Sequence, residues 1–184
     1  MTTTQRSPLV SAEEYLHGER DAPMRHEYVA GRVFAMTGGS VRHNRITGNL
    51  YTEIRARIGR SPCDIFVSDM KVQALEAYYY PDLMVVCDPA DQDPYTKTRP
   101  VVVIEVASPT TRSIDEREKR LAYLSIPTLR EYVLAEQDRA EVQILRRDDE
   151  GKWEEERIGA NGSIRFASLD LVVPMQAVYE GVWR

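Results

Sequence analysis

Val101-Val102-Val103-Ile104-Glu105-Val106-Ala107 is apolar at every position but one, and such a run is typical of a strand buried on both faces of a sheet. The exception is Glu105. Removing a carboxylate from water is costly unless a cation, a metal ion or several hydrogen-bond donors compensate it. A carboxylate kept in a core strand therefore indicates a functional site. The alternative is an acid at the strand end that pairs with an arginine or caps the next turn.

A second acid lies beside another apolar run. Asp82 follows Pro81 and precedes Leu83-Met84-Val85-Val86-Cys87, which predicts a second core strand. If the two strands are neighbours, the carboxylates of Asp82 and Glu105 converge and can bind one cation. Alone, Asp82 is equally well explained as a turn residue after a proline.

Composition limits the class of protein. The chain has 184 residues, 42% of them hydrophobic, and a formal net charge of −5. This length predicts a single domain over residues 11–184, after a polar tail at residues 1–10. An acidic chain is not a generally basic nucleic-acid binder, so any nucleic-acid surface is expected to be a local patch.

Cysteine usage and hydropathy predict the compartment. Cys63 and Cys87 have no CxxC spacing and no adjacent histidine, so we expect reduced thiols rather than a disulfide or a zinc site. The first eight residues are polar and no segment approaches the length of an apolar membrane span. We therefore expect a cytoplasmic protein without a membrane segment.

The order of elements predicts an α/β fold with a mixed central sheet flanked by helices, preceded by an N-terminal helix and a hairpin. A capping box at Ser11 and Glu14 begins a helix that ends near Gly18, and Ala30-Gly31 is the turn of the hairpin. The remaining expected elements are a helix over residues 41–58, strands over 64–74, 78–87 and 101–106, a helix over 113–124 begun by a second capping box, strands over 131–134 and 141–146, and weaker strands up to 166.

The helix over residues 41–58 has one apolar stripe and basic flanks. Ile46, Leu50, Ile54 and Ile58 recur every fourth residue. Between residues 41 and 60 there are five arginines and one acid, namely Arg42, Arg45, Arg55, Arg57, Arg60 and Glu53. The arginines fit contact with phosphates or, alternatively, a solvated helix face.

The ordered set of motifs resembles the restriction-endonuclease-like (PD-(D/E)XK-type) nucleases, and in finer detail their Uma2 (Uma-two) family. Pro81-Asp82 and Glu105 stand where the signature has its two acids, whereas Ala107 stands where it has lysine. The finer similarity is carried by Glu105-Val106-Ala107-Ser108-Pro109-Thr110-Thr111, Asp115-x-x-x-Lys119-x-x-x-Tyr123, Pro127-x-x-x-Glu131-Tyr132, Glu27-x-x-x-Gly31, His43 and Ser68-Asp69-Met70-Lys71-Val72. It spans about residues 11 to 180.

The resemblance implies a magnesium-dependent, or manganese-dependent, endonuclease that acts on DNA. Asp82, Glu105 and the main-chain carbonyl of Val106 would bind the metal. Lys119 is the candidate for the missing lysine, and Glu27 and His43 are further candidates for catalysis. Contacts with nucleic acid are assigned to Arg42, Arg45, Arg55 and Lys71.

Several alternatives stay open at this stage. The spacing of Asp115, Lys119 and Tyr123 also fits a surface ion pair on a helix. His43 falls on the apolar stripe and fits a buried structural histidine, Glu27 fits a structural hairpin acid, and Lys71 could face the cleft or solvent. For the whole chain, the alternatives are a catalytically silent nuclease-like module that binds nucleic acid or protein, and a hydrolase of a smaller phosphate ester. A homodimer is expected because a domain of this size often needs a second copy to grip a duplex.

Overall fold

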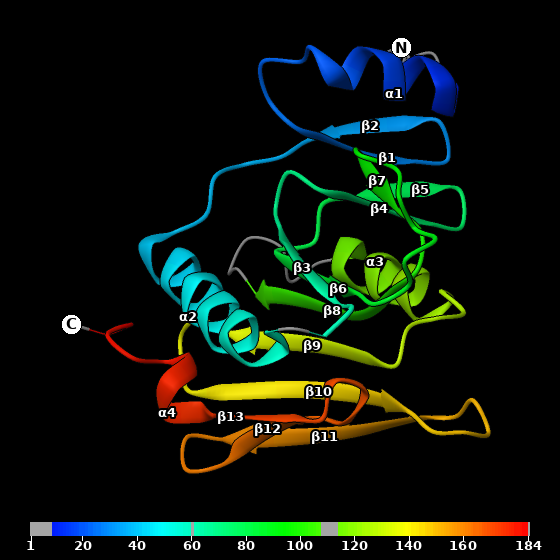
Figure 1. Ribbon diagram of the computed structural model, residues 1–184. Coiled ribbons are helices and arrows are strands. Elements are labelled where there is room, and N and C mark those ends of the chain that lie inside the picture. The colour runs from blue at the N-terminus through cyan, green and yellow to red at the C-terminus, as the bar shows by residue number, and fades with distance from the viewer. Residues whose placement is uncertain (1–8, 60, 108–113, 184) are drawn as a thin grey trace.

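A six-stranded mixed sheet is the centre of the computed structural model, which describes residues 9–59, 61–107 and 114–183 (Figure 1). Its strand order is β11-β10-β9-β8-β6-β3. The strands are β3 (Asp64–Val67), β6 (Leu83–Val86), β8 (Pro100–Ala107), β9 (Glu131–Glu136), β10 (Glu141–Arg147) and β11 (Trp153–Gly159). Only β8 and β9 pair in parallel, and the crossover between them contains α3 (Ile114–Leu124).

Two helices cover opposite faces of this sheet because successive side chains of a strand point to opposite sides. Helix α2 (Val41–Ile58) buries its stripe of Ile46, Leu50, Ile54 and Ile58 in a cluster with Leu83 and Ile104 among others. Helix α3 packs Ala122 and Tyr123 in a second cluster that contains Met84 and Val103. Glu105 follows Ile104 and therefore points to the α3 side.

A second sheet of five strands lies on the α3 side, above the central sheet in Figure 1. Its order is β2-β1-β5-β4-β7, from β1 (His26–Val29), β2 (Arg32–Ala35), β4 (Lys71–Ala74), β5 (Ala77–Tyr79) and β7 (Thr96–Lys97). The predicted hairpin is confirmed as β1 and β2, and both turn residues have positive φ, 45° at Ala30 and 88° at Gly31. Helix α1 (Ala12–Arg20) begins at the predicted capping box but ends two residues after Gly18.

Two predicted strands were wrong, because each divides between the two sheets. Residues 64–74 form β3 in the central sheet and β4 in the small sheet, and Asp69 between them has φ 97°, which no strand residue adopts. Residues 78–87 contain the end of β5 and the whole of β6, which are separated at Pro81, a residue without an N–H for strand pairing. Asp82 therefore lies where the chain returns from the small sheet to the central sheet.

The C-terminal part contains the weaker strands predicted up to residue 166 and adds elements beyond them. Strand β12 (Ser163–Phe166) pairs with the unpredicted β13 (Leu171–Pro174) in a hairpin around a short 3-10 helix, η1 (Ala167–Leu169), and α4 (Met175–Val178) follows. Phe166, Val173, Met175 and Val178 join the core beneath α2. In the part of the chain that the structure describes, no helix is long and apolar enough to cross a membrane. The second predicted capping box, at Ser113, and Arg60 lie outside the described residues.

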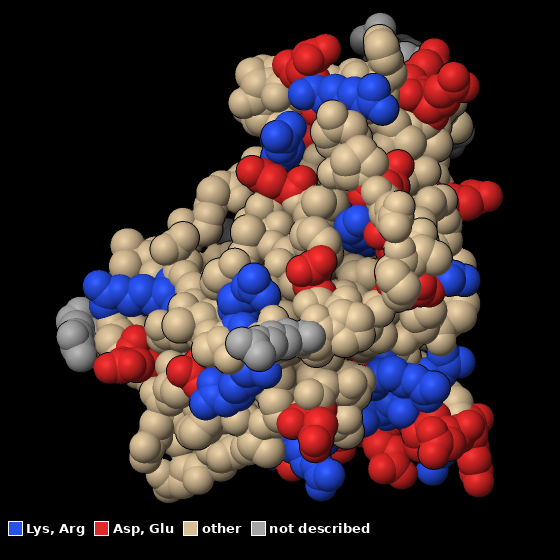
Figure 2. All heavy atoms as spheres, viewed as in Figure 1, with Lys and Arg blue, Asp and Glu red and all other residues tan. Residues whose placement is uncertain are grey.

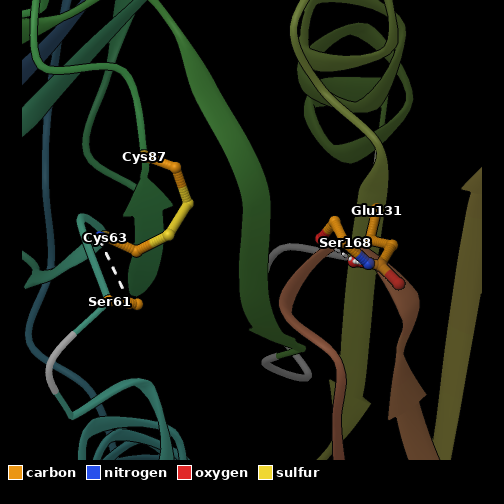
Figure 3. The surroundings of a disulfide bond; sticks show 5 residues. All are labelled: Ser61, Cys63, Cys87, Glu131 and Ser168. Carbon is orange, nitrogen blue, oxygen red and sulfur yellow. Dashed lines mark hydrogen bonds between the residues drawn. A yellow bond between two sulfur atoms is a disulfide. The ribbon is translucent and has the colours of Figure 1, made fainter.

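Cys63 and Cys87 form a disulfide, so the prediction of two reduced thiols was wrong (Figure 3). The pairing of Asp64 with Val86 places the residue before β3 opposite the residue after β6. The backbone N–H of Cys63 also donates to Ser61 Oγ at 3.2 Å. The spacing along the sequence gave no sign of this contact, which depends on antiparallel pairing of the two strands.

Candidate active site

The register of β6 and β8 brings the two predicted acids together. Leu83 pairs with Ile104 in an antiparallel arrangement, so one step further places Asp82 opposite Glu105. Asp82 is held at this point because its Oδ2 accepts a hydrogen bond of 2.7 Å from the backbone N–H of Val106. The expectation that both acids lie on neighbouring strands is confirmed.

Lys119 reaches the same place from α3. Its Nζ lies 3.1 Å from Glu105 Oε1 and 2.7 Å from Glu27 Oε1, and the side chain is 20% exposed. Burial alone would lower the pKa of Lys119, but the carboxylates of Glu105 and Glu27 raise it above the usual value. The ammonium group therefore stays charged between the two acids.

Glu27 comes from the small sheet, so the cluster joins both sheets. Besides Lys119, its Oε1 accepts a hydrogen bond of 3.2 Å from the backbone N–H of Tyr80. Tyr80 follows β5, and β5 pairs with β1, which carries Glu27. The cluster therefore depends on the relative position of the two sheets.

His43 lies in the first turn of α2 and contacts Asp82. Its Nε2 is 3.1 Å from Asp82 Oδ2, and this hydrogen bond raises the pKa of His43 above its usual range. Gly39 makes the contact possible, because a Cβ at that position would lie 2.8 Å from His43 Nδ1. His43 is thus not on the buried face of the stripe but at the edge of the cavity.

Tyr123 is a member of the cluster that the sequence had shown only as part of a helical spacing. Its hydroxyl donates to Glu105 Oε1 at 2.8 Å, and the side chain is fully buried. Burial raises the pKa of Tyr123 well above its usual range, so the phenol is a donor at neutral pH. Its place four residues after Lys119 puts both side chains on one face of α3, and this was the available signal.

Burial also acts on Glu105. It raises the pKa of the carboxyl to about 7, with further contributions from Asp82 and Glu27, while Lys119 and the Tyr123 hydroxyl oppose the shift. Both the protonated and the ionised form of Glu105 are therefore populated near neutral pH. A carboxyl group with such a pKa can bind a cation or exchange a proton.

All of these acids and bases except Tyr123 line one cavity of about 830 Å³. Its walls come from both sheets, from the segment Thr37–Ser40 and from the first turns of α2. Figure 2 shows the molecule hollowed between the part that carries β2 and the part that carries α2. The arrangement of acids, a lysine and a histidine in a cavity is suited to hydrolysis.

A model of the Uma2 family, described as "Putative restriction endonuclease", matches residues 12–177. The chain belongs to the Uma2 family. Two uncharacterized proteins of Synechocystis sp. (strain ATCC 27184 / PCC 6803 / Kazusa) are 33% and 31% identical to it, over 95% and 93% of this chain and 94% and 100% of theirs. The family resemblance expected from the sequence is confirmed.

The fold of this Uma2 chain is also found in a solved structure, the "putative nuclease belonging to DUF820" from Anabaena variabilis ATCC 29413. The TM-score is 0.75, and the match covers 94% of this chain and 99% of that one at 14% sequence identity. At this identity the likeness shows the fold alone. The mixed α/β, restriction-endonuclease-like fold is therefore shown for this Uma2 chain.

The donor atoms of the Uma2 site suit a small hard cation. Asp82 and Glu105 offer carboxylate oxygens, and magnesium is usually bound by one or two carboxylates together with water and substrate phosphate. The described residues contain no cluster of three or more His, Cys, Asp or Glu side chains arranged to hold a metal. A cation at this site would therefore need ligands from main chain, water or substrate.

The basic residues assigned to nucleic acid do not line this cavity. Arg42 pairs with Asp138 at 3.3 Å and Arg45 donates to the carbonyl of Gly181, whereas Arg55 is exposed on α2. Lys71 is only 6% exposed and donates to the Tyr80 hydroxyl at 3.4 Å, so it faces the interior rather than solvent, and its contact with nucleic acid stays a prediction. Burial of Lys71 lowers its pKa.

Proposed function

We propose that this Uma2 protein is a metal-dependent endonuclease that hydrolyses phosphodiester bonds, with DNA as the substrate. The observation that carries the proposal is the position of Lys119 Nζ, 3.1 Å from Glu105 and 2.7 Å from Glu27, in the cavity that Asp82 also lines. Two acids and a lysine at one point are the chemical components of the nuclease signature, even though Ala107 replaces the strand lysine.

Magnesium or manganese, held by Asp82, Glu105 and the carbonyl of Val106, would supply an activated water and neutralise charge on the phosphate. The other groups belong to the protein. Lys119 places its ammonium where negative charge builds up on the phosphate in the transition state, a role that is fulfilled best in a site shielded from water. In this proposal, Lys119 on α3 supplies the positive charge that the lysine of the nuclease signature supplies from the strand.

His43 is proposed to handle a proton. Its hydrogen bond to Asp82 orients the imidazole at the cavity edge, and the raised pKa keeps the ring protonated to higher pH than in a free histidine. A protonated imidazole can donate to the leaving oxygen. Glu27 is proposed to orient Lys119, since its Oε1 accepts hydrogen bonds from both Lys119 Nζ and the backbone N–H of Tyr80.

The proposal includes the compartment, the oligomeric state and the phosphate contacts outside the cavity. We propose that the protein acts on DNA in the cytoplasm and as a homodimer, which would bring a second copy of the site to the other strand of a duplex. Arg42, Arg45 and Arg55 remain candidates for phosphate contact outside the cavity. On the face shown in Figure 2, blue and red side chains are mixed, which agrees with phosphate contacts that are few and local.

The experiment is cleavage of supercoiled plasmid DNA by the full chain with magnesium or manganese, and again with EDTA. We expect nicking that requires the metal and that Asp82→Asn and Glu105→Gln abolish. The same variants should lose the increase in melting temperature that manganese gives to the wild type, since a ligand stabilises the state that binds it. Metal-independent binding of DNA without cleavage by the wild type would instead support the silent module.

A further inference from the structure

Strand β2 carries an aromatic side chain that the folding of the domain does not require. Phe34 is 47% exposed and lies on the edge strand of the small sheet. It lines the cavity that contains Asp82 and Glu105. An exposed phenylalanine at the wall of a polar cavity gains nothing from contact with water, and a flat apolar group of a ligand could cover its ring.

The strand register fixes the place of Phe34 relative to the catalytic cluster. Phe34 pairs directly with Glu27 across β1 and β2, so the two side chains lie on the same face of the sheet. Directly opposite residues of an antiparallel pair have Cβ atoms about 5 Å apart. A group stacked on the ring would therefore lie within one nucleotide of a phosphate bound beside Lys119, the partner of Glu27.

The charges of the cavity also favour a ligand that binds by stacking on Phe34. Its acids, Glu27, Asp69, Asp82, Glu105 and Glu118, outnumber its bases, Arg25, His43 and Lys119. Arg25 is already paired with Asp69 at 3.4 Å. Such a cavity offers no track of free cations for the two backbones of a duplex, whereas stacking of a base on an aromatic ring needs no charge.

We propose that the substrate presents an unpaired nucleotide at the cleavage site and that its base stacks on Phe34. This inference rests on the proposed nuclease function and narrows the substrate to single-stranded nucleic acid, or to unpaired positions in a duplex. In an intact duplex both faces of each base are covered by neighbouring bases, so the ring of Phe34 would have nothing to bind. Arg32, exposed two residues earlier on the same face, is positioned for a flanking phosphate.

The test measures the affinity of the full chain for a fluorescein-labelled oligothymidylate, and for a duplex of equal length, by fluorescence anisotropy with calcium in place of magnesium. Phe34→Ala should weaken binding of the oligothymidylate by about tenfold or more, the loss expected when a stacked aromatic is removed. Phe34→Trp should preserve the affinity, because the larger ring still stacks.

Val33→Ala is the matched control. Val33 is 42% exposed on the same strand but pairs with Tyr28 on the opposite face, and it does not line the cavity. We expect this variant to bind the oligothymidylate like the wild type. Melting temperatures of all three variants should match the wild type because both positions are exposed.

The outcomes separate this inference from the function on which it rests. Tighter binding of the duplex by the wild type, or equal losses in Phe34→Ala and Val33→Ala, would overturn the unpaired nucleotide while plasmid cleavage could still show a nuclease. Conversely, binding of oligothymidylate that depends on Phe34, without metal-dependent cleavage of any nucleic acid, would support the stacking site and overturn the nuclease.

Discussion

Replacing Lys119 by methionine should test whether its ammonium group holds the acidic cluster together. The change keeps an unbranched side chain that is one atom shorter, but it leaves Glu27 and Glu105, which are 19% and 14% exposed, without the cation that lies within 3.1 Å of both. Removing one partner of a buried ion pair costs about 3–5 kcal/mol. Because Glu105 already has a pKa raised to about 7, it can relieve part of the repulsion by taking up a proton.

We therefore expect a loss of unfolding free energy of about 3 kcal/mol at neutral pH, which for a chain of this length lowers the melting temperature by about 6–12 °C. The assay is urea unfolding followed by tryptophan fluorescence. The loss should shrink as the pH falls, because protonated carboxyls no longer repel each other, and manganese should restore stability to Lys119→Met by replacing the missing positive charge.

The matched control is Arg120→Met on the same helix. Arg120 pairs with Glu155 at 3.2 Å, but both side chains are about one-third exposed. Exposed ion pairs contribute about 0–1 kcal/mol. If Lys119→Met lost no more stability than Arg120→Met, or if its loss were the same at every pH, the buried ammonium would not hold the acidic cluster together.

Two further predictions concern the edge of the cavity and the disulfide. Gly39→Ala should lower the rate of DNA cleavage at least tenfold with little change in stability, because its Cβ would displace His43 from its carboxylate partner; an unchanged pH profile of the residual cleavage would show that His43 had not moved. Reduction of Cys63–Cys87, which closes a loop with a sequence separation of 24, should lower the unfolding free energy by about 3 kcal/mol, as measured by urea unfolding with and without dithiothreitol. A Cys63→Ser, Cys87→Ser variant should not respond to the reductant, and a wild type equally insensitive to it would contradict the prediction.

The acidic pair could be predicted from the sequence because it depends on few steps of folding. Two apolar runs, each carrying one acid, become neighbouring strands in the central sheet, and the register then fixes the acids opposite each other. The position of Lys119 near Glu105 could be predicted for a similar reason, since a crossover helix returns along the face of the strand that precedes it. The contact between Lys119 and Glu27 could not be predicted, because it depends on how two separate sheets pack.

The periodicity of apolar residues could not predict that two apparently continuous strands are each divided between the two sheets. The runs at residues 64–74 and 78–87 each look continuous, and only the positive φ of Asp69 and the missing N–H of Pro81 divide them. The disulfide follows from the pairing that results from this division. Tyr123 was overlooked because its spacing from Lys119 was equally compatible with a solvent-exposed helix face, and the burial of α3 against two sheets decided between the two.

The division of the cluster between the sheets has a consequence for motion. Glu27 belongs to the small sheet, whereas Glu105 lies in β8 of the central sheet and Asp82 directly precedes β6 of the same sheet. Lys119 contacts both Glu27 and Glu105. Any ligand that binds both sides acts as a clamp, so its binding free energy opposes local opening of β1 and β2. Amide exchange in this hairpin is then thermodynamically linked to occupancy of the cavity. Mutations that weaken the contact between the two sheets should reduce the affinity for a ligand of the cavity even where the mutated residue does not touch that ligand.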